Sequence, residues 1–221
     1  MKNAALGLAL TIPCWLLILV GWGLGDREAF FSSWERAIAL ASLWPMFWAG
    51  IAAGIKLSGP AHAESKAQAV IPVFVTGGFA LGMFALPRWD RMGSPAWLIL
   101  GQPEVVRPLG LALMLAGLGV ASWALLTLRR FFSPRIMVQK DHQLVRRGPY
   151  RWIRHPFYLG LSLLALGFPL VFRSWLGFPV LVLFFPAVAW RMTIEEKLLG
   201  DAFGSAYDEY KKTSWRLLPH V

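Results

Sequence analysis

Two polar segments hold the side chains of this 221-residue chain that could do chemistry. The first, residues 129–154, carries eight Lys or Arg residues against one acid and runs directly into His155 and Pro156. Because proline favours the first position of a helix, a helix is predicted to begin at Pro156 with His155 at its N-terminus. The free N–H groups of such a helix end favour a carboxylate or another anionic ligand group.

The second polar segment follows Trp190 and places three ionisable side chains close together. Arg191 and Glu195 are four residues apart, so they share one face of a helix, while Glu196 points in a different direction. An amphipathic helix at the membrane interface with an ordinary ion pair would explain this pattern. A functional site explains it as well, because ionisable groups at the end of an apolar run are costly and usually have a function.

The composition decides which class of protein must position these groups. Apolar residues make up 57% of the chain, charged residues only 15%, and the mean hydropathy is +0.53. Such a chain cannot cover its own surface with polar groups, which excludes a soluble globule and a disordered chain. One cysteine and four scattered histidines exclude a disulfide framework and predict no metal site. We therefore expect an integral membrane protein of one or at most two domains.

Six uncharged runs are long enough to cross a bilayer, which takes about 17–25 residues. They are continuous and do not alternate, so helices are expected and not a barrel. The predicted fold is an all-α integral membrane protein with about six transmembrane helices, the last two forming a tight hairpin at Arg173, followed by a cytoplasmic C-terminal amphipathic helix. The six runs are residues 3–25, 37–55, 67–87, 108–128, 156–172 and 174–190.

Charge placement predicts the orientation of these helices. With six spans, 16 of the 22 Lys and Arg residues fall on the side that holds both termini. The positive-inside rule places that side, and both polar segments, in the cytoplasm. The net charge of +10 then reflects topology and attraction to anionic membrane lipids, and not nucleic-acid binding. We divide the chain into N-terminal transmembrane helices, residues 1–128, and a C-terminal part, residues 129–221, that holds a cofactor-binding loop, the hairpin and a catalytic tail.

The two polar segments flank the predicted hairpin, and a hairpin returns the chain to the same face of the membrane. His155 at its start and Arg191 and Glu195 at its end are therefore expected to be neighbours. The sequence predicts one pocket at the cytoplasmic membrane edge with hydrogen-bond donors, a cation and a carboxylate.

The same residues carry a family resemblance. The segment reads HQLVRRGPYRWIRHPFYLG, and about thirty residues later come R-x-x-x-E-E and F-G-x-x-Y-x-x-Y. This pattern resembles the isoprenylcysteine carboxyl methyltransferase and phospholipid methyltransferase superfamily of integral membrane enzymes. The resemblance covers about residues 139–219 and implies a methyltransferase that uses S-adenosylmethionine on a lipophilic acceptor.

The resemblance also implies roles for individual residues. Arg191 matches a substrate-facing arginine, and Glu196 matches the second acid of a glutamate pair, so both are assigned to catalysis. Positions that match the cofactor-binding motifs are Gln139, His142, Gln143, Leu144, Val145, Tyr150, His155, Pro156, Phe157, Tyr158 and Glu195.

The physical chemistry of these residues fits that reaction. Glu195 can accept from the ammonium of S-adenosylmethionine, and His155 or the helix-start N–H groups can donate to its carboxylate. A carboxylate acceptor needs no general base and could be held by Arg191, which favours O-methylation of an isoprenylcysteine-type carboxylate. An amine acceptor would need a proton acceptor such as Glu196 or His155. A phospholipid amine and a small thiol remain open as acceptors.

Two other classes of protein deserve comparison. Membrane sterol reductases resemble this superfamily in the same region and use NADPH, whose 2′-phosphate could meet the basic loop at Arg146, Arg147, Arg151 and Arg154. The glutamate pair, however, suits an ammonium better than a phosphate. A non-enzymatic scaffold or small transporter would carry ionisable groups near the bilayer midplane, whereas here they gather at one face.

Overall fold

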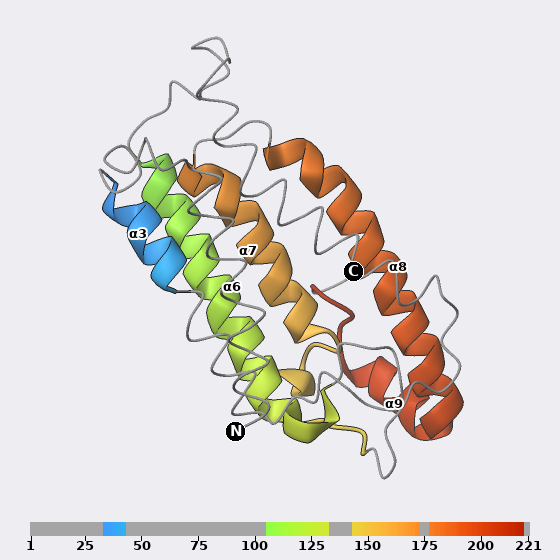
Figure 1. Cartoon of the computed structure of the whole chain (residues 1–221). Helices are drawn as coiled ribbons and strands as arrows, with labels where there is room; N and C mark the ends of the chain where they lie inside the picture. Colours follow the sequence, from blue (N-terminus) through green and yellow to red (C-terminus); the bar gives the residue numbers. More distant parts are fainter. Residues whose placement is uncertain (1–32, 43–104, 133–142, 173–176, 219–221) are drawn as a thin grey trace, which may run out of the picture.

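The computed structural model describes residues 33–42, 105–132, 143–172 and 177–218 (Figure 1). Within these ranges the regular structure is helical, and no strand is present. A parallel bridge pairs Ile153 with Trp215. The α-helices are α3 (Trp34–Ala41), α6 (Val106–Leu128), α7 (Pro156–Phe172), α8 (Gly177–Phe203) and α9 (Ser205–Thr213), and the short 3-10 helices are η1 (Arg129–Phe131) and η2 (Gly148–Arg151).

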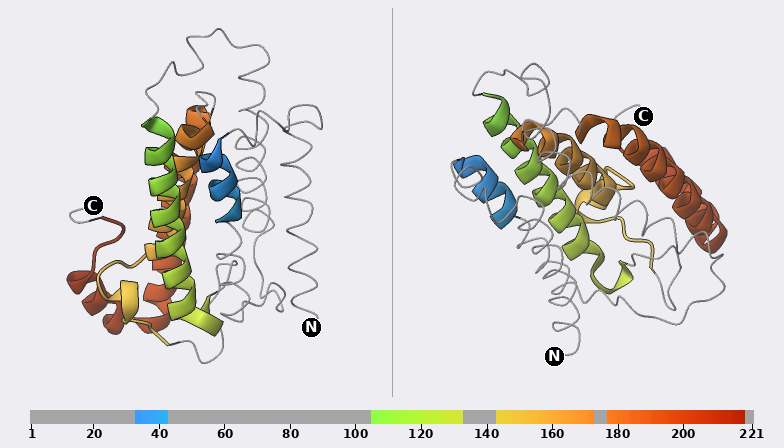
Figure 2. Two further views of the ribbon diagram at one scale, coloured as in Figure 1. Left: turned by 90° about the vertical axis from the view of Figure 1, so that its left-hand side faces the viewer. Right: turned by 45° about the horizontal axis from the view of Figure 1, so that its top comes forward.

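Helices α6, α7 and α8 follow one another in alternating directions along the molecule (Figure 1). The C-terminal end of α6, the N-terminal end of α7 and the C-terminal end of α8 therefore gather at one end. Both η2 and α9 lie at that same end, which the left view of Figure 2 also shows. The polar segments that the sequence singles out meet there.

Two of the predicted helices agree closely with the structure. The run 108–128 lies within α6, and the run 156–172 coincides with α7, which begins at the proline expected to start it. The last helix differs, because α8 begins at Gly177 and continues beyond Trp190 to Phe203. After Trp190 the sequence has no glycine or proline until Gly200, and the chain turns at Gly204, whose φ of +52° favours glycine. Arg191, Glu195 and Glu196 thus lie on the same helix as the apolar run.

Helices α6 and α8 are long and apolar enough to cross a membrane, and α7 is a shorter apolar helix. They fit a membrane protein. The runs 3–25 and 67–87 lie outside the described residues, and the run 37–55 is described only where α3 covers its start. Residues 173–176, which join α7 to α8, also lie outside them. The count of six spans, the tight hairpin and the cytoplasmic termini therefore stay predictions.

The outer face of α8 is apolar, as a lipid-facing helix requires. Phe184 and Val188 are buried on one side of the helix. Val182 and Leu183 on the other side are 70% and 77% exposed. A helix that is apolar all round is typical of a membrane span, because a soluble helix would carry polar side chains on its exposed face.

Helices α6 and α7 touch through glycines. A Cβ atom on Gly117 of α6 would lie 2.5 Å from the Gly160 carbonyl oxygen of α7, and one on Gly167 of α7 would lie 2.5 Å from the Gly110 carbonyl oxygen. Small residues at such contacts let two helix backbones approach closely in a membrane. This close contact fixes α7, which begins directly after His155 and carries Tyr158, against α6.

Gly117→Ala should therefore destabilise the protein, while Gly119→Ala should not. The new methyl group at position 117 meets backbone atoms of α7, and overpacking of this kind costs about 1–3 kcal/mol. A Cβ at Gly119, on the same helix, meets nothing within 4 Å, and alanine is the better helix former by about 1 kcal/mol. Thermal unfolding of both variants in detergent measures the difference. Equal midpoints for the two variants would contradict the close contact.

Candidate active site

The chain that enters α7 is fixed by the C-terminal segment. The Trp215 N–H donates to the Trp152 carbonyl at 2.8 Å, and the Arg154 N–H donates to the Trp215 carbonyl at 2.8 Å. The His155 N–H donates to the Arg216 carbonyl at 3.2 Å. Residues 152–155 and 214–216 thus run side by side, and this pairing sets where His155 stands at the start of α7.

Helix α9 packs on η2 through two buried tyrosines. The Tyr210 hydroxyl donates to the Tyr150 carbonyl at 2.6 Å, and Ser214 in turn donates to the Tyr210 carbonyl at 2.5 Å. Burial raises the pKa of Tyr150 well above its usual value and that of Tyr210 to about 12, so both hydroxyls stay protonated. Gly148 opens η2 with a φ of +58°, which favours glycine.

Glu195 of α8 faces the start of α7. Its Oε1 accepts a short hydrogen bond from the Tyr158 hydroxyl and lies 3.3 Å from Arg191 Nε. Arg191 Nε also donates to the Tyr158 hydroxyl at 2.6 Å. The other oxygen, Oε2, lies 3.8 Å from His155 Nδ1, which is longer than a hydrogen bond. The Glu195 side chain is 24% exposed, so a ligand can reach this carboxylate.

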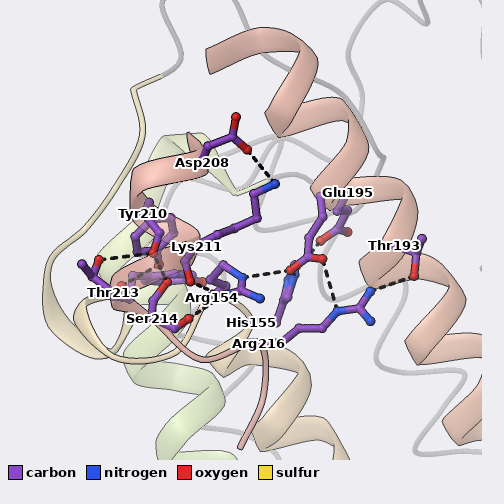
Figure 3. A network of polar contacts seen from close by, with 12 residues as sticks. Arg154, His155, Thr193, Glu195, Asp208, Tyr210, Lys211, Thr213, Ser214 and Arg216 are labelled. Carbon is purple, nitrogen blue, oxygen red and sulfur yellow. Dashed lines mark hydrogen bonds and ion pairs between the residues drawn. The ribbon is translucent and has the colours of Figure 1, made fainter. Parts of the chain in front are cut away.

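Glu196, the next residue, binds a different set of groups. Its partners are Arg154, His155 and Arg216, which Figure 3 labels. Glu196 Oε1 accepts from Arg154 Nε at 2.9 Å and lies 3.3 Å from His155 Nε2, and Oε2 lies 3.3 Å from Arg216 Nε. Glu196 lies beyond the apolar part of α8, which ends at Trp190. Burial by itself would raise the pKa of the Glu196 carboxyl, but the three basic side chains beside it lower that pKa to about 2.

These contacts confirm the predicted proximity of His155 to the charged end of α8. His155, only 5% exposed, stands between the two adjacent carboxylates of Glu195 and Glu196. Helical geometry explains the division, since neighbouring residues on a helix point in different directions. Glu195 faces Tyr158 and Arg191, while Glu196 faces Arg154 and the C-terminal segment.

The other predicted cofactor residues have more varied surroundings. Tyr150 and Tyr158 are buried at the site, Pro156 is fully buried, and Phe157 packs edge-to-face on Phe132 with ring centroids 5.0 Å apart. The irregular segment before η2 holds Gln143, Leu144 and Val145. Gln139 and His142 lie outside the described residues. Among the described residues no group of three or more potential metal ligands is present.

Two arginines bind at the site that the sequence did not assign to it. Arg154 stands inside the quoted motif, but the sequence suggested a contact for it only in the reductase alternative, with a phosphate. In the structure it binds Glu196 and the Ser214 and Lys211 carbonyls. Arg216 carried no signal at all, because it reaches Glu196 only through the pairing of its segment with residues 152–155. A pattern of spacing along the chain does not reveal a contact of that kind.

The fold and the site define an apolar helical protein with a charged site at one end of its helices. Residues 110–200 match the sequence model of the isoprenylcysteine carboxyl methyltransferase (ICMT) family. Over these residues the chain is similar to that family, and this match and the relatives below indicate a methyltransferase.

Individual relatives extend the match along the chain. The chain is 26% identical to the protein-S-isoprenylcysteine O-methyltransferase of Schizosaccharomyces pombe, in an alignment that covers 96% of this chain and 90% of the relative. It is 36% identical to the protein of the same name from Saccharomyces cerevisiae, over 47% of this chain and 44% of the relative. With the Tribolium castaneum protein of that name it shares 30% identity over 62% of this chain and 50% of the relative. The chain thus spans about half the length of the latter two.

Glu196→Gln should lower the stability of the folded protein at neutral pH, and the difference from the wild type should shrink in acid. The carboxyl titrates near 4.5 when free and near 2 in the folded protein. Its contribution is therefore full above a pH of about 4.5 and is lost as the pH falls towards 2. Unfolding midpoints of the wild type and the variant in detergent should converge between about pH 6 and about pH 3. Glu209→Gln, the same change at an exposed position of α9, is the control and should follow the wild type throughout. A constant difference for Glu196→Gln across this range would contradict the assignment.

Proposed function

We propose that this chain is a membrane methyltransferase that uses S-adenosylmethionine to methylate the carboxylate of an isoprenylated cysteine. The observation that carries the proposal is the meeting of Glu195, Arg191 and His155 at one end of the apolar helices. The names of the relatives agree with this acceptor. The positive-inside pattern supports a site on the cytoplasmic side.

The donors and acceptors of the site fit such a cofactor. Glu195 Oε2, on a partly exposed side chain, would accept from the ammonium group. His155 Nε2 already faces Glu196, so its other nitrogen, Nδ1, 3.8 Å from Glu195 Oε2 and beyond hydrogen-bond distance, would be the one beside the carboxylate of the cofactor. The first N–H groups of α7 add the positive end of a helix dipole beside it. Tyr150 and Tyr158 supply aromatic faces for the adenine or the sulfonium.

Arg191 would hold the acceptor. S-adenosylmethionine, when bound, would supply an electrophilic methyl group. Its transfer to a carboxylate oxygen would form a C–O bond as the C–S bond breaks, with S-adenosylhomocysteine as the leaving group. Arg191 Nε is already engaged with Tyr158 and Glu195, which fixes the direction of its guanidinium. A guanidinium fixed in this way orients a carboxylate without a proton transfer. Correct placement of two reactants can contribute about 7–11 kcal/mol to a reaction of this kind.

The surroundings of Glu196 weigh against an amine acceptor. An amine must lose a proton, and a carboxyl whose pKa is about 2 is a weak base at neutral pH. Its two oxygens are also in contact with Arg154, His155 and Arg216. We therefore assign Glu196 to holding the site in place and not to proton transfer, which favours the carboxylate acceptor.

The basic loop is also poorly placed to bind a phosphate of NADPH. Arg154 binds Glu196 and two carbonyls of the C-terminal segment. Arg146 donates to the Ala206 carbonyl, and its guanidinium lies 5.5 Å from the centre of the Tyr210 ring. Two of the four arginines considered for a 2′-phosphate thus bind within the protein, which weighs against the reductase alternative.

Calorimetric titration of the full chain in detergent tests the cofactor. S-adenosylhomocysteine should bind saturably and NADPH should not. Glu195→Gln should weaken the binding of S-adenosylhomocysteine by about tenfold to a hundredfold, because a hydrogen bond to a charged group is lost. Glu209→Gln is the matched control. Binding of NADPH alone, or normal binding by Glu195→Gln, would contradict the proposed cofactor site.

Arg191→Ala should leave cofactor binding nearly unchanged and reduce methyl transfer to the acceptor. We expect S-adenosylhomocysteine to bind within about threefold of wild type, while methyl transfer to a small isoprenylated cysteine falls by about a hundredfold, the effect of losing one charged hydrogen bond in the transition state. Calorimetry and a radiolabelled methyl-transfer assay measure the two effects. If both fell together, Arg191 would belong to the cofactor site.

A further inference from the structure

Arg216 makes contacts with three parts of the site from near the end of the chain. Its Nε lies 3.3 Å from Glu196 Oε2, and its Nη2 donates to Thr193 Oγ1 at 2.7 Å (Figure 3). Its carbonyl accepts the N–H of His155 at 3.2 Å. One residue therefore joins the C-terminal segment to α8 and to the first residue before α7.

The position of the Arg216 side chain matters because Arg216 and Arg154 approach different oxygens of the Glu196 carboxylate. Arg154 binds Oε1 from the side of the chain that leads into α7, and Arg216 meets Oε2 from the C-terminal segment. Arg154 donates a hydrogen bond to one oxygen of the Glu196 carboxylate, and Arg216 is a second cation 3.3 Å from the other oxygen, so the carboxylate is restrained from both sides. The imidazole of His155 lies against the same Oε1 atom, at 3.3 Å. A contact that restrains the Glu196 carboxylate therefore also restrains the position of the His155 imidazole beside it.

Glu195 depends on the same arrangement. It is the neighbour of Glu196 on α8, and Thr193, the second contact of Arg216, stands on the helix two residues before it. Because Arg216 contacts both Glu196 and Thr193 from the C-terminal segment, it fixes this part of α8 relative to the start of α7. The gap between Glu195 Oε2 and His155 Nδ1, now 3.8 Å, lies across that junction.

We infer that Arg216 is a positioning residue for the proposed reaction, acting through Glu196 on the placement of His155 and Glu195. The inference rests on the proposed function. Arg216 needs no contact with cofactor or acceptor in this role. Its side chain, 30% exposed, instead links the C-terminal segment to α8, the helix that carries Glu195 and Glu196, and acts as a clamp between them.

The experiment compares five variants with the wild type in the full chain, and Glu196→Gln alone is one of them. Arg216→Ala removes the clamp, and Arg216→Lys keeps a cation but loses the fork that reaches Glu196 and Thr193 together. Lys212→Ala removes the same charge from an exposed position of α9 and is the control. The double variant of Arg216→Ala with Glu196→Gln tests whether Arg216 acts through Glu196. Each is measured for the Kd of S-adenosylhomocysteine, for kcat and KM with a small isoprenylated cysteine, and for the unfolding midpoint.

Arg216→Ala should raise the Kd or lower kcat by about tenfold or more, and Arg216→Lys should recover part of that loss. Lys212→Ala should match the wild type. The double variant should be no worse than Glu196→Gln alone, because the two residues would share one effect. Additive losses, no recovery by lysine, or a lowered unfolding midpoint with unchanged Kd and kcat would each overturn the inference. Failure of the wild type to bind S-adenosylhomocysteine would instead overturn the proposed function.

Discussion

The ion pairs of Glu196 are the constraint on which the candidate site depends. One carboxylate meets Arg154, His155 and Arg216, which come from the entry to α7 and from the C-terminal segment. A partly buried charge of this kind is stable only while it is paired, so removal of one partner leaves the others without compensation. The result is a rigid junction between three stretches of chain that are far apart in sequence.

The packing of the apolar helices fixes the helix ends that meet at this junction. The glycine contacts between α6 and α7 fix α7 at one side, and the buried stripe of α8 with Phe184 and Val188 packs on the same core. Because α8 continues as one helix beyond Trp190, the position of its apolar part also sets where Glu195 and Glu196 stand. The packing of the apolar part of α8 thus determines the positions of the charged side chains at its polar end.

The division of labour between two adjacent acids follows from helix geometry. Glu195 faces Tyr158 and Arg191 and keeps one oxygen towards His155 at 3.8 Å, which suits a residue proposed to meet a ligand. Glu196 faces two arginines and stays charged down to a pH of about 2, which suits a residue that holds structure. The family resemblance alone assigned both acids to the reaction, and their surroundings distinguish them.

Much of this arrangement was determined by the sequence alone. The uncharged runs located α6 and α7 because a membrane helix must be continuously apolar, and the proline of the H-P motif marked the start of α7. The expected return of the chain to one face predicted that His155 lies near Glu195, and the two side chains are 3.8 Å apart. Tertiary structure decided the rest. The roles of Arg154 and Arg216, the length of α8 and the separate surroundings of the two glutamates depend on which segments pack together, and pairing between residues sixty positions apart leaves no periodic signal in the chain.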